Sequence, residues 1–444
     1  MRTLYSLAAW AAQPLLRRKL ARRGVAEPGY LHAVDERFGH YATPRPEGAG
    51  PLIWIHAVSL GETRAAAILL TALRERLPGM RLLLTHGTAT GRAEGQKLLQ
   101  PGDVQVWQPW DSRGATQRFV DYFRPDLGVL METEIWPNLI AACRARNVPL
   151  ALVNARLSAR SLRGAERAGW LLRPAYGALS AAYAQTEADA ARLRAIGVKH
   201  VAVQGNLKFD AQPDAAQRAQ ASGWRAALGA RPVVMLASSR EGEEAEFLGL
   251  TGTPPLASKA QGATQSIAFT APLWLIVPRH PQRFDEVARL AADRGWRVGR
   301  RSAWQGVPPD EALSADVWIG DSLGEMALYY GLADVALLGG SFAPLGGQNL
   351  IEAAACGCPV VMGPHTFNFA QAAEWAEAAG AAHRVAHLAE GLMLARQLLA
   401  DAPRRDAMRR AGLAFAAEHR GAARRTADAL AALLRAGGAP PSVD

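Results

Sequence analysis

The chain has 444 residues, of which 49% are hydrophobic and 20% are charged. This length and composition predict two or three domains with large buried cores and exclude a disordered protein. Three cysteines are too few for a disulfide framework, and the pair Cys356 and Cys358 lacks the spacing of a redox or zinc motif. The formal net charge of +10 indicates an acidic partner: nucleic acid, an anionic lipid surface or a phosphorylated substrate.

Residues 1–43 contain an apolar stretch, 4–16, which is followed by the basic residues Arg17, Arg18, Lys19, Arg22 and Arg23. The stretch is shorter than the roughly 20 residues that cross a bilayer. A cleavable signal peptide would carry its charges before the apolar part rather than after it. We therefore expect an uncleaved membrane-associating segment on an anionic surface, oriented to the cytoplasmic face by its positive charge. A first helix packed on the protein's own core is the alternative.

Six apolar segments bounded by turn residues predict strands in the first half, with helical patterns between most of them. This alternation indicates a parallel, doubly wound sheet, which we assign to a Rossmann-like domain of residues 44–212. The predicted strands are 52–58, 81–85, 104–107, 127–131, 149–153 and 181–185.

Acidic residues follow two of these strands. Glu62 comes after 52–58, where a helix begins, and Glu132 and Glu134 come directly after 127–131. Because the carboxyl ends of parallel strands meet at one edge of a sheet, these carboxylates are candidates for a site at that edge. The alternative for Glu62 is an ordinary acid in the first turn of its helix, stabilised by the helix dipole.

The second half repeats the pattern. Residues 213–230 predict a linker, and residues 231–444 predict a second Rossmann-like domain. Its predicted strands are 232–237, 273–277, 316–319, 335–338 and 359–362. Residues 250–271, rich in Gly, Pro, Ser and Thr, predict a loop excursion. From residue 370 onward the pattern is almost wholly helical, and such helices could cross back to brace the first half.

Residues 335–364 combine a strand, the glycine pairs at 339–340 and 346–347, a helical segment and a second strand. In such βαβ units the backbone amides and the helix N-terminus face an anion, and Gln348 or Asn349 is well placed to cap the helix. A tight turn in an ordinary α/β core is the alternative.

Further candidate anion binders follow other strands of the second half: Arg279 and His280 after 273–277, and the turn Gly324, Glu325 and Met326 after 316–319. Anion binders in one half and carboxylates with Lys208 in the other predict a cleft enzyme, in the layout of a glycosyl transfer between domains. A metal site is not expected, because the chain has no DxD motif, and His383 and His387 lack the glutamate of a zinc-protease motif.

Seven ordered motifs resemble those of one family, the 3-deoxy-D-manno-octulosonic acid (Kdo) transferases of lipopolysaccharide synthesis. They are HAVSLGE (56–62), METEIWPN (131–138), GNLKFD (205–210), VPRHPQRF (277–284), GDSLGEM (320–326), GGSFAPLGGQNLIE (339–352) and GPHTFNF (363–369). The resemblance runs from the N-terminus to about residue 369. One departure is Arg240, where the family usually has histidine, and another is the 250–271 excursion.

The resemblance implies a GT-B fold, with two Rossmann-like domains facing across a cleft. It implies transfer of Kdo from CMP-Kdo to a lipid A precursor at the cytoplasmic face of the inner membrane, with inversion and without a metal or other cofactor. By the same resemblance, Glu62 is the general base, and Glu132 and Lys208 assist the transition state. The CMP-binding residues would be Arg279, His280, Gly324, Glu325, Met326, Asn349, Leu350, Ile351 and Glu352.

Two other functions compete with this interpretation. The first is a GT-B transferase that moves another sugar, such as a hexosamine from its UDP derivative, to a lipid carrier. The second is a nucleic-acid-binding protein, which the net charge of +10 permits. The arginines lack interleaved aromatic residues and no helix-turn-helix, RRM or KH signature is present, so we expect no nucleic-acid partner.

Overall fold

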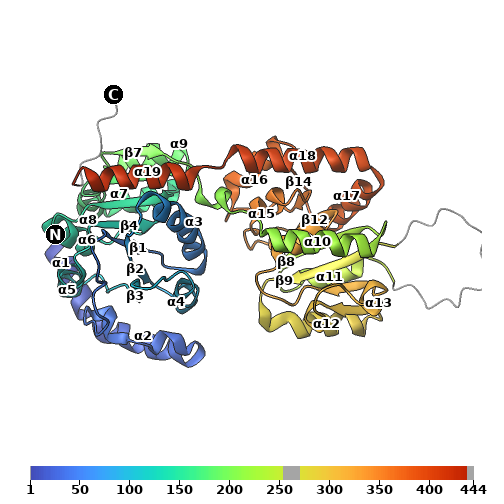
Figure 1. The fold of residues 1–444 in the computed structure, drawn as a ribbon, viewed down its shortest axis with the longest axis horizontal. Coiled ribbons are helices and arrows are strands. Elements are labelled where there is room, and N and C mark those ends of the chain that lie inside the picture. The colour runs from blue at the N-terminus through green and yellow to red at the C-terminus, as the bar shows by residue number, and fades with distance from the viewer. Residues whose placement is uncertain (1, 254–270, 438–444) are drawn as a thin grey trace, which may run out of the picture. The chain divides into compact units, whose positions relative to one another are not determined.

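The computed structural model describes residues 2–253 and 271–437, and the chain forms two compact units (Figure 1). Unit 1 comprises Met1–Asp210 together with His419–Asp444, and unit 2 comprises Ala211–Glu418. The chain therefore passes between the units twice. Each unit is built on a seven-stranded sheet. The strands are all parallel and helices cover both faces, as the sequence predicts, although fewer strands were predicted in each half.

The sheet of unit 1 has the strand order β3-β2-β1-β4-β5-β6-β7. Its strands are β1 (Leu52–His56), β2 (Arg81–His86), β3 (Val104–Trp107), β4 (Leu127–Met131), β5 (Leu150–Ala155), β6 (Ala181–Ala184) and β7 (Val201–Val203). β1 is buried along its whole length, which fits a strand covered on both faces. Alternate side chains of β1 pack into different cores, Trp54 with Phe119 on one face and Ile55 with Leu69 on the other.

The helices of unit 1 are α1 (Arg2–Ala11), α2 (Gln13–Ala26), α3 (Leu60–Arg76), α4 (Ala89–Gln96), α5 (Arg113–Phe123), α6 (Pro137–Ala145), α7 (Ala159–Arg167), α8 (Gly169–Tyr176), α9 (Glu187–Ile196) and α19 (Ala422–Arg435). Short 3-10 turns are η1 (Pro28–Leu31), η2 (Val34–Phe38) and η3 (Leu207–Asp210). Across the described residues, none of the helices combines the length and the apolar character that crossing a bilayer requires.

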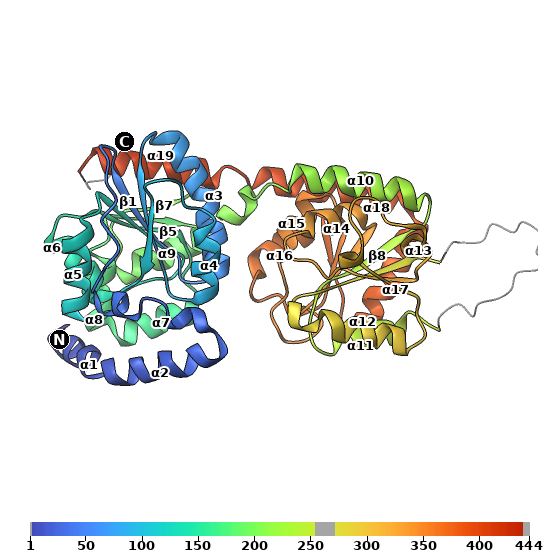
Figure 2. The same ribbon diagram turned by 60° about the horizontal axis from the view of Figure 1, so that its bottom comes forward.

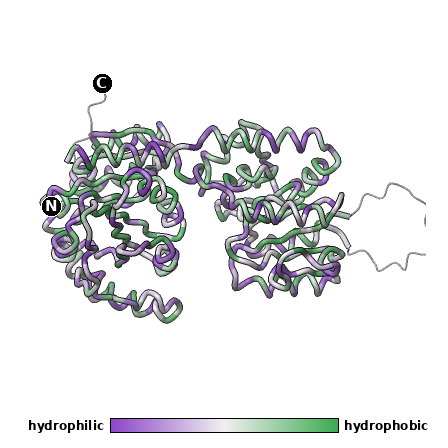
Figure 3. The backbone as a smooth tube through the Cα atoms, in the orientation of Figure 1, coloured by the Kyte–Doolittle hydropathy of each residue, from purple (hydrophilic) through white to green (hydrophobic). Residues whose placement is uncertain are grey.

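The sheet of unit 2 has the order β10-β11-β9-β8-β12-β13-β14. Its strands are β8 (Val233–Ser239), β9 (Leu273–Pro278), β10 (Val298–Arg300), β11 (Val317–Ile319), β12 (Val335–Leu338), β13 (Val360–Met362) and β14 (Ala382–Arg384). Its helices are α10 (Ala215–Leu228), α11 (Glu243–Leu250), α12 (Phe284–Asp293), α13 (Asp310–Leu313), α14 (Met326–Leu332), α15 (Leu350–Ala355), α16 (Ala370–Ala378), α17 (Leu388–Ala400) and α18 (Ala402–Glu418), with 3-10 turns η4 (Pro281–Arg283) and η5 (Arg301–Ala303). In Figure 3 the strands of unit 1 stand out among the hydrophobic parts of the backbone.

The structure corrects the predicted domain boundaries in two places. Residues 213–230, expected to be a linker, form α10, which packs on α14 within unit 2 and buries Trp224. The C-terminal part of the predicted second domain, from His419, belongs to unit 1, where α19 lies beside α3 (Figures 1 and 2). The sequence analysis had allowed for C-terminal helices that cross back to brace the first half of the chain. Most of the predicted excursion at 250–271 lies outside the described residues.

Candidate active site

The strand order of unit 1 reverses between β1 and β4, which are direct neighbours in the sheet. In open α/β sheets, ligands bind beyond the carboxyl ends of the strands at such a switch point. Glu62 lies in the first turn of α3, shortly after β1, and Glu132 directly follows β4. The fold therefore brings both predicted catalytic carboxylates to the switch point of unit 1.

Glu62 is held by the N-terminus of α3. Its Oε2 accepts a hydrogen bond from the Val58 amide at 2.9 Å, and its Oε1 accepts one from Ser59 Oγ at 3.0 Å. Ser59 in turn caps α3 by accepting from the Glu62 amide at 3.4 Å, so the pair resembles a capping box. Glu62 therefore also stabilises the start of its own helix, as the alternative interpretation expected. Two further lone-pair positions on the carboxylate remain for a ligand.

The environment of Glu62 favours its protonated form. Burial, helped by the negative charges of Glu132 and Glu134, raises the pKa of Glu62 to about 7 in spite of the opposing hydrogen bond from Val58. A carboxyl group with such a pKa exchanges protons readily at neutral pH, as a general base must.

Glu132 is paired with the predicted lysine. Lys208 Nζ lies 3.4 Å from Glu132 Oε1, and Asn154 Nδ2 donates to the same oxygen at 3.4 Å. Asn154 Oδ1 also accepts a hydrogen bond from the Leu207 amide at 3.1 Å, which fixes the turn η3 that carries Lys208. Sequence reasoning missed Asn154, although a polar residue at the end of a predicted strand was an available signal.

The backbone at this edge is strained. Glu132 and Asn154 both have left-handed conformations, with φ of 56° and 52°. For a residue other than glycine, such a conformation costs about 1 kcal/mol or more and tends to occur at functional sites. Asparagine adopts this conformation more readily than glutamate, so the strain falls mainly on Glu132.

Glu134 completes a group of three carboxylates. Its Oε2 accepts from Trp136 Nε1 at 2.7 Å and lies 3.8 Å from His56 Nε2. Burial lowers the pKa of His56 to about 3, so the imidazole is neutral at pH 7 and does not neutralise Glu134. Burial also raises the pKa of Glu134.

In unit 2 the switch point lies between β8 and β12, and the first glycine pair follows β12. The Gly340 amide, expected to face an anion, instead donates to both carboxylate oxygens of Glu243, at 2.8 and 2.9 Å. A Cβ at position 339 would stand 2.6 Å from the Ser238 carbonyl oxygen. The Gly339-Gly340 pair is therefore a tight turn against β8, which corrects the anion-binding prediction for this pair.

The second glycine pair leads into α15. Gly346 and Gly347 have φ of 90° and 71°, conformations that glycine adopts without strain. Asn349 caps α15, as predicted, and its Oδ1 accepts from the Ile351 amide at 3.2 Å. The Leu350 and Ile351 side chains are buried in the core, so these two residues offer a ligand only their backbone.

Arg279 and His280 follow β9, the strand beside β8. Burial lowers the pKa of His280, and the positive charges of Arg240, Arg279 and Arg283 lower it further. Arg283 is neutralised by Glu244 at 2.7 Å, whereas Arg240 lies 3.8 Å from the exposed Glu241. His280 thus lies near three arginines, and carboxylates offset part of their charge.

The turn from Gly324 to Met326 follows β11, two strands away from β8. Gly324 O accepts from Gln217 Nε2 at 2.8 Å. Both carboxylate oxygens of Glu325 accept from Arg301, at 2.8 and 2.9 Å, so that side chain already serves an internal ion pair. Within the described residues, no three His, Cys, Asp or Glu side chains are grouped so that they could hold a metal ion.

Two Rossmann-like units with polar loops at their switch points define the class of GT-B-like enzymes. Solved structures share this fold: a glycosyltransferase from Rickettsia africae (TM-score 0.56, 12% identity, 87% of this chain and 99% of that one) and a putative UDP-N-acetylglucosamine 2-epimerase from Listeria monocytogenes (TM-score 0.54, 13% identity, 89% and 100%). At these identities the likeness shows the fold alone.

The sequence comparisons define the family. The family model described as 3-deoxy-D-manno-octulosonic-acid transferase (kdotransferase) matches residues 32–211. The 3-deoxy-D-manno-octulosonic acid transferase of Bordetella pertussis is 49% identical over 97% of this chain and 98% of its own length. That of Haemophilus influenzae is 31% identical, with the same coverage. The chain belongs to the Kdo transferase family and is a glycosyltransferase, which confirms the resemblance seen in the motifs.

Proposed function

We propose that this Kdo transferase uses Glu62 as the base that activates a hydroxyl group of a lipid A precursor for attack on CMP-Kdo. The hydroxyl oxygen forms a bond to the anomeric carbon of Kdo as the bond from that carbon to the phosphate oxygen breaks. CMP leaves with the electron pair, and the hydroxyl proton passes to the Glu62 carboxylate. Attack opposite the leaving group inverts the anomeric configuration.

The observation that carries this proposal is the environment of Glu62 at the switch point of unit 1. Its orientation is fixed by Val58 and Ser59, and its pKa is raised to about 7. A positioned base of this kind contributes roughly 10²- to 10⁴-fold to the rate of a proton transfer.

Glu132 and Lys208 are proposed to act as a unit beside the base. Their side chains lie 3.4 Å apart, and Asn154 orients both of them. The carboxylate can stabilise positive charge that develops on the sugar ring, and the ammonium group can offset negative charge near the donor. The left-handed backbone at Glu132 fits a residue that is positioned for chemistry.

The donor nucleotide is assigned to unit 2. Arg279 and His280 supply side chains for its phosphate, while Leu350, Ile351, Gly324 and Met326 offer backbone groups. Asn349 and Glu352 flank the start of α15, and Glu325 contributes through its backbone because Arg301 occupies its carboxylate. Arg240 adds a cation at the same end. Transfer without a metal or cofactor and a cleft between the two units remain predictions.

The N-terminal helices are proposed to hold the enzyme on the cytoplasmic face of the inner membrane. α1 and the start of α2 expose Leu4 (65%), Leu7 (57%), Trp10 (67%) and Leu15 (69%). The exposed basic residues of α2 follow directly in the sequence. Apolar side chains next to a basic cluster suit the interface of an anionic bilayer.

A product assay tests the proposed function. The full chain, supplied with CMP-Kdo and a lipid A precursor, should yield a product heavier by one or more Kdo residues, measured by mass spectrometry. UDP-hexosamines in place of CMP-Kdo should give no product. Transfer from a UDP-sugar, or no transfer from CMP-Kdo, would contradict the proposal.

A further inference from the structure

Two grooves run along α6 in unit 1, one on each side of the small residues Ala141 and Ala145, which line both. One groove lies between α6 and α8 and has a volume of about 620 Å³. The other lies between α6 and α5 and has a volume of about 140 Å³. The larger volume is within the range of roughly 300–1,000 Å³ that small-molecule sites occupy.

The groove between α6 and α8 is mainly apolar. Its walls include Ile140 from α6 and Trp170, Leu171 and Pro174 from α8. Trp170 is 50% exposed, so part of its ring is accessible to a ligand in this groove. Among the described residues that line this groove, the charged ones are Arg2 and Arg144. An apolar lining with cationic side chains beside it fits a lipid chain that carries an anionic head.

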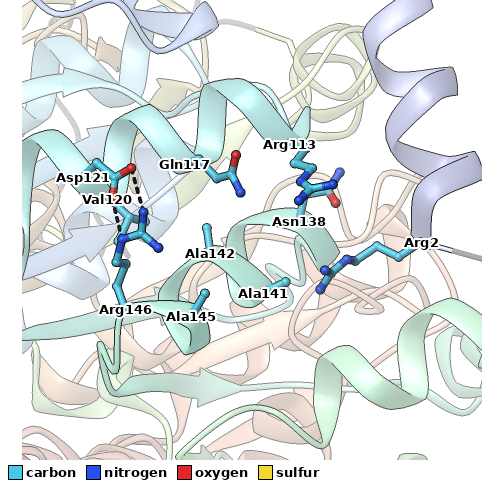
Figure 4. A pocket seen from close by; sticks show the side chains of 10 residues that line it. All are labelled: Arg2, Arg113, Gln117, Val120, Asp121, Asn138, Ala141, Ala142, Ala145 and Arg146. Atoms are coloured by element: carbon cyan, nitrogen blue, oxygen red, sulfur yellow. Dashed lines mark hydrogen bonds and ion pairs between the residues drawn. The ribbon is translucent and has the colours of Figure 1, made fainter.

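The smaller groove adds more positive charge. Its lining includes Arg2, Arg113 and Arg146, with Asp121 as the acidic member. Arg146 is bound to Asp121 at 2.6 and 3.0 Å. Figure 4 shows this pair at one end of the groove, whereas Arg113 and Arg2 lie at the other end, near Asn138. Among the described residues that line this groove, the arginines without an ion pair therefore lie near the N-terminal end of α6.

That end of α6 is next to the catalytic edge. Trp136, the N-cap residue of α6, donates its indole N–H to Glu134. Arg2 is supplied by α1, whose Ser6 donates to Asn138 Oδ1 at 2.8 Å. The proposed catalytic edge and α1, whose apolar residues are exposed for a membrane, therefore both meet the grooves at the N-terminal end of α6.

We infer that the groove between α6 and α8 binds an acyl chain of the phosphorylated lipid acceptor, while Arg2 and Arg113 bind a phosphate of its sugar head. This inference rests on the proposed function and specifies how its acceptor is recognised. A chain bound here keeps the head group beside Glu134 and the catalytic edge. Part of the acceptor's binding energy then comes from its lipid, away from the reacting hydroxyl group.

The test uses the full chain with Ala145→Trp. This substitution places a bulky indole on the wall that the two grooves share, at an exposed position. Ala191→Trp, on the exposed face of α9, is the matched control. If the new indole displaces about two methylene groups of the acyl chain from the groove, the acceptor should bind about tenfold more weakly. We therefore expect Ala145→Trp to raise KM for the acylated acceptor about tenfold, with kcat and KM for CMP-Kdo unchanged.

A deacylated, phosphorylated acceptor separates the groove from general damage. Ala145→Trp and the wild type should use this acceptor equally well, whereas Arg113→Gln should raise its KM. An equal loss on both acceptors, or an unchanged KM for the acylated one, would overturn the inference. The inference would also be overturned if Ala145→Trp bound vesicles of plain anionic phospholipid more weakly than the wild type, because the groove would then hold a lipid of the bilayer. If the wild type transfers Kdo to neither acceptor, the proposed function fails instead.

Discussion

The carboxylate of Glu62 has two tasks at the end of β1. It accepts hydrogen bonds from Val58 and Ser59, which stabilise the start of α3, and it is the proposed base. The two tasks agree, because the bonds that cap the helix also fix the direction in which the remaining lone pairs point. The same bonds lower the pKa of Glu62, while burial and the neighbouring Glu132 and Glu134 raise it.

The pH dependence of transfer should follow this balance. With the pKa of Glu62 raised to about 7, kcat/KM should increase as the pH rises through 7 and level off above it, because only the ionised carboxylate accepts a proton. Glu62→Gln can still accept the Val58 hydrogen bond, but it should lower kcat by about 10²-fold or more and remove this pH limb. Near-normal turnover by Glu62→Gln would exclude the base role.

Ser59→Ala is a companion variant at the same turn. It removes a hydrogen bond that lowers the pKa of Glu62, so the rising limb should shift to higher pH while the plateau rate is retained. A merely structural loss would lower the rate at all pH values without moving the limb. The loss of the helix cap itself should cost about 1 kcal/mol of stability.

Among the elements, strands with at least three consecutive buried residues were predictable, and strands without such a run were not. β3, β4 and β12 have the predicted ends, because three to five consecutive buried residues leave a clear apolar run. β7, β10 and β14 were missed, since three half-exposed residues at a sheet edge show no periodicity. α10 was also missed, because its many small and polar residues resembled a linker, although its Trp224 is buried.

At the candidate site, residue types were predictable from their position after strands, whereas their partners were not. Glu62 and Glu132 come together because β1 and β4 are neighbours, and Lys208 joins them because Asn154, at the end of β5, holds the turn η3. The sequence does not specify this strand order. The Gly340 amide was misassigned because its partner, Glu243, is almost a hundred residues away in the sequence. Contacts of that range depend on topology rather than on local pattern.

α1 should bind membranes without contributing to the core. None of its ten residues is buried, so replacing Leu4, Leu7 and Trp10 by Ser should leave the fold intact. Each loses about 1.5 kcal/mol or more of interfacial burial, so sedimentation with anionic vesicles should weaken at least about a hundredfold. Met393→Ser, at an exposed apolar residue of α17, is the control. Undiminished vesicle binding by the triple variant would exclude α1 as the anchor.

At the scale of the whole molecule, the C-terminus of the chain supports the catalytic edge of unit 1. The Asp210 carboxylate accepts hydrogen bonds from the amides of Gly421 and Ala423, and Arg425 donates to Gln204 O. η3, which carries Lys208, packs against both α19 and α3. The aspartate of the GNLKFD motif therefore has a structural task, to hold the start of α19, while the lysine two residues earlier faces Glu132.

Leu430 tests whether α19 is an integral part of unit 1. It is fully buried in the core that contains Ile55 and Leu69, more than 350 positions earlier in the sequence. Leu430→Ala should therefore destabilise unit 1 by about 2–5 kcal/mol, through lost burial and the cavity left behind. Amide hydrogen exchange should accelerate in β1 and β4 but not in β8 and β12. Leu392→Ala, equally buried in unit 2, should produce the opposite pattern. If Leu430→Ala left exchange in β1 unchanged, α19 would be a surface helix that unit 1 does not need, and the support it gives to Lys208 would be dispensable as well.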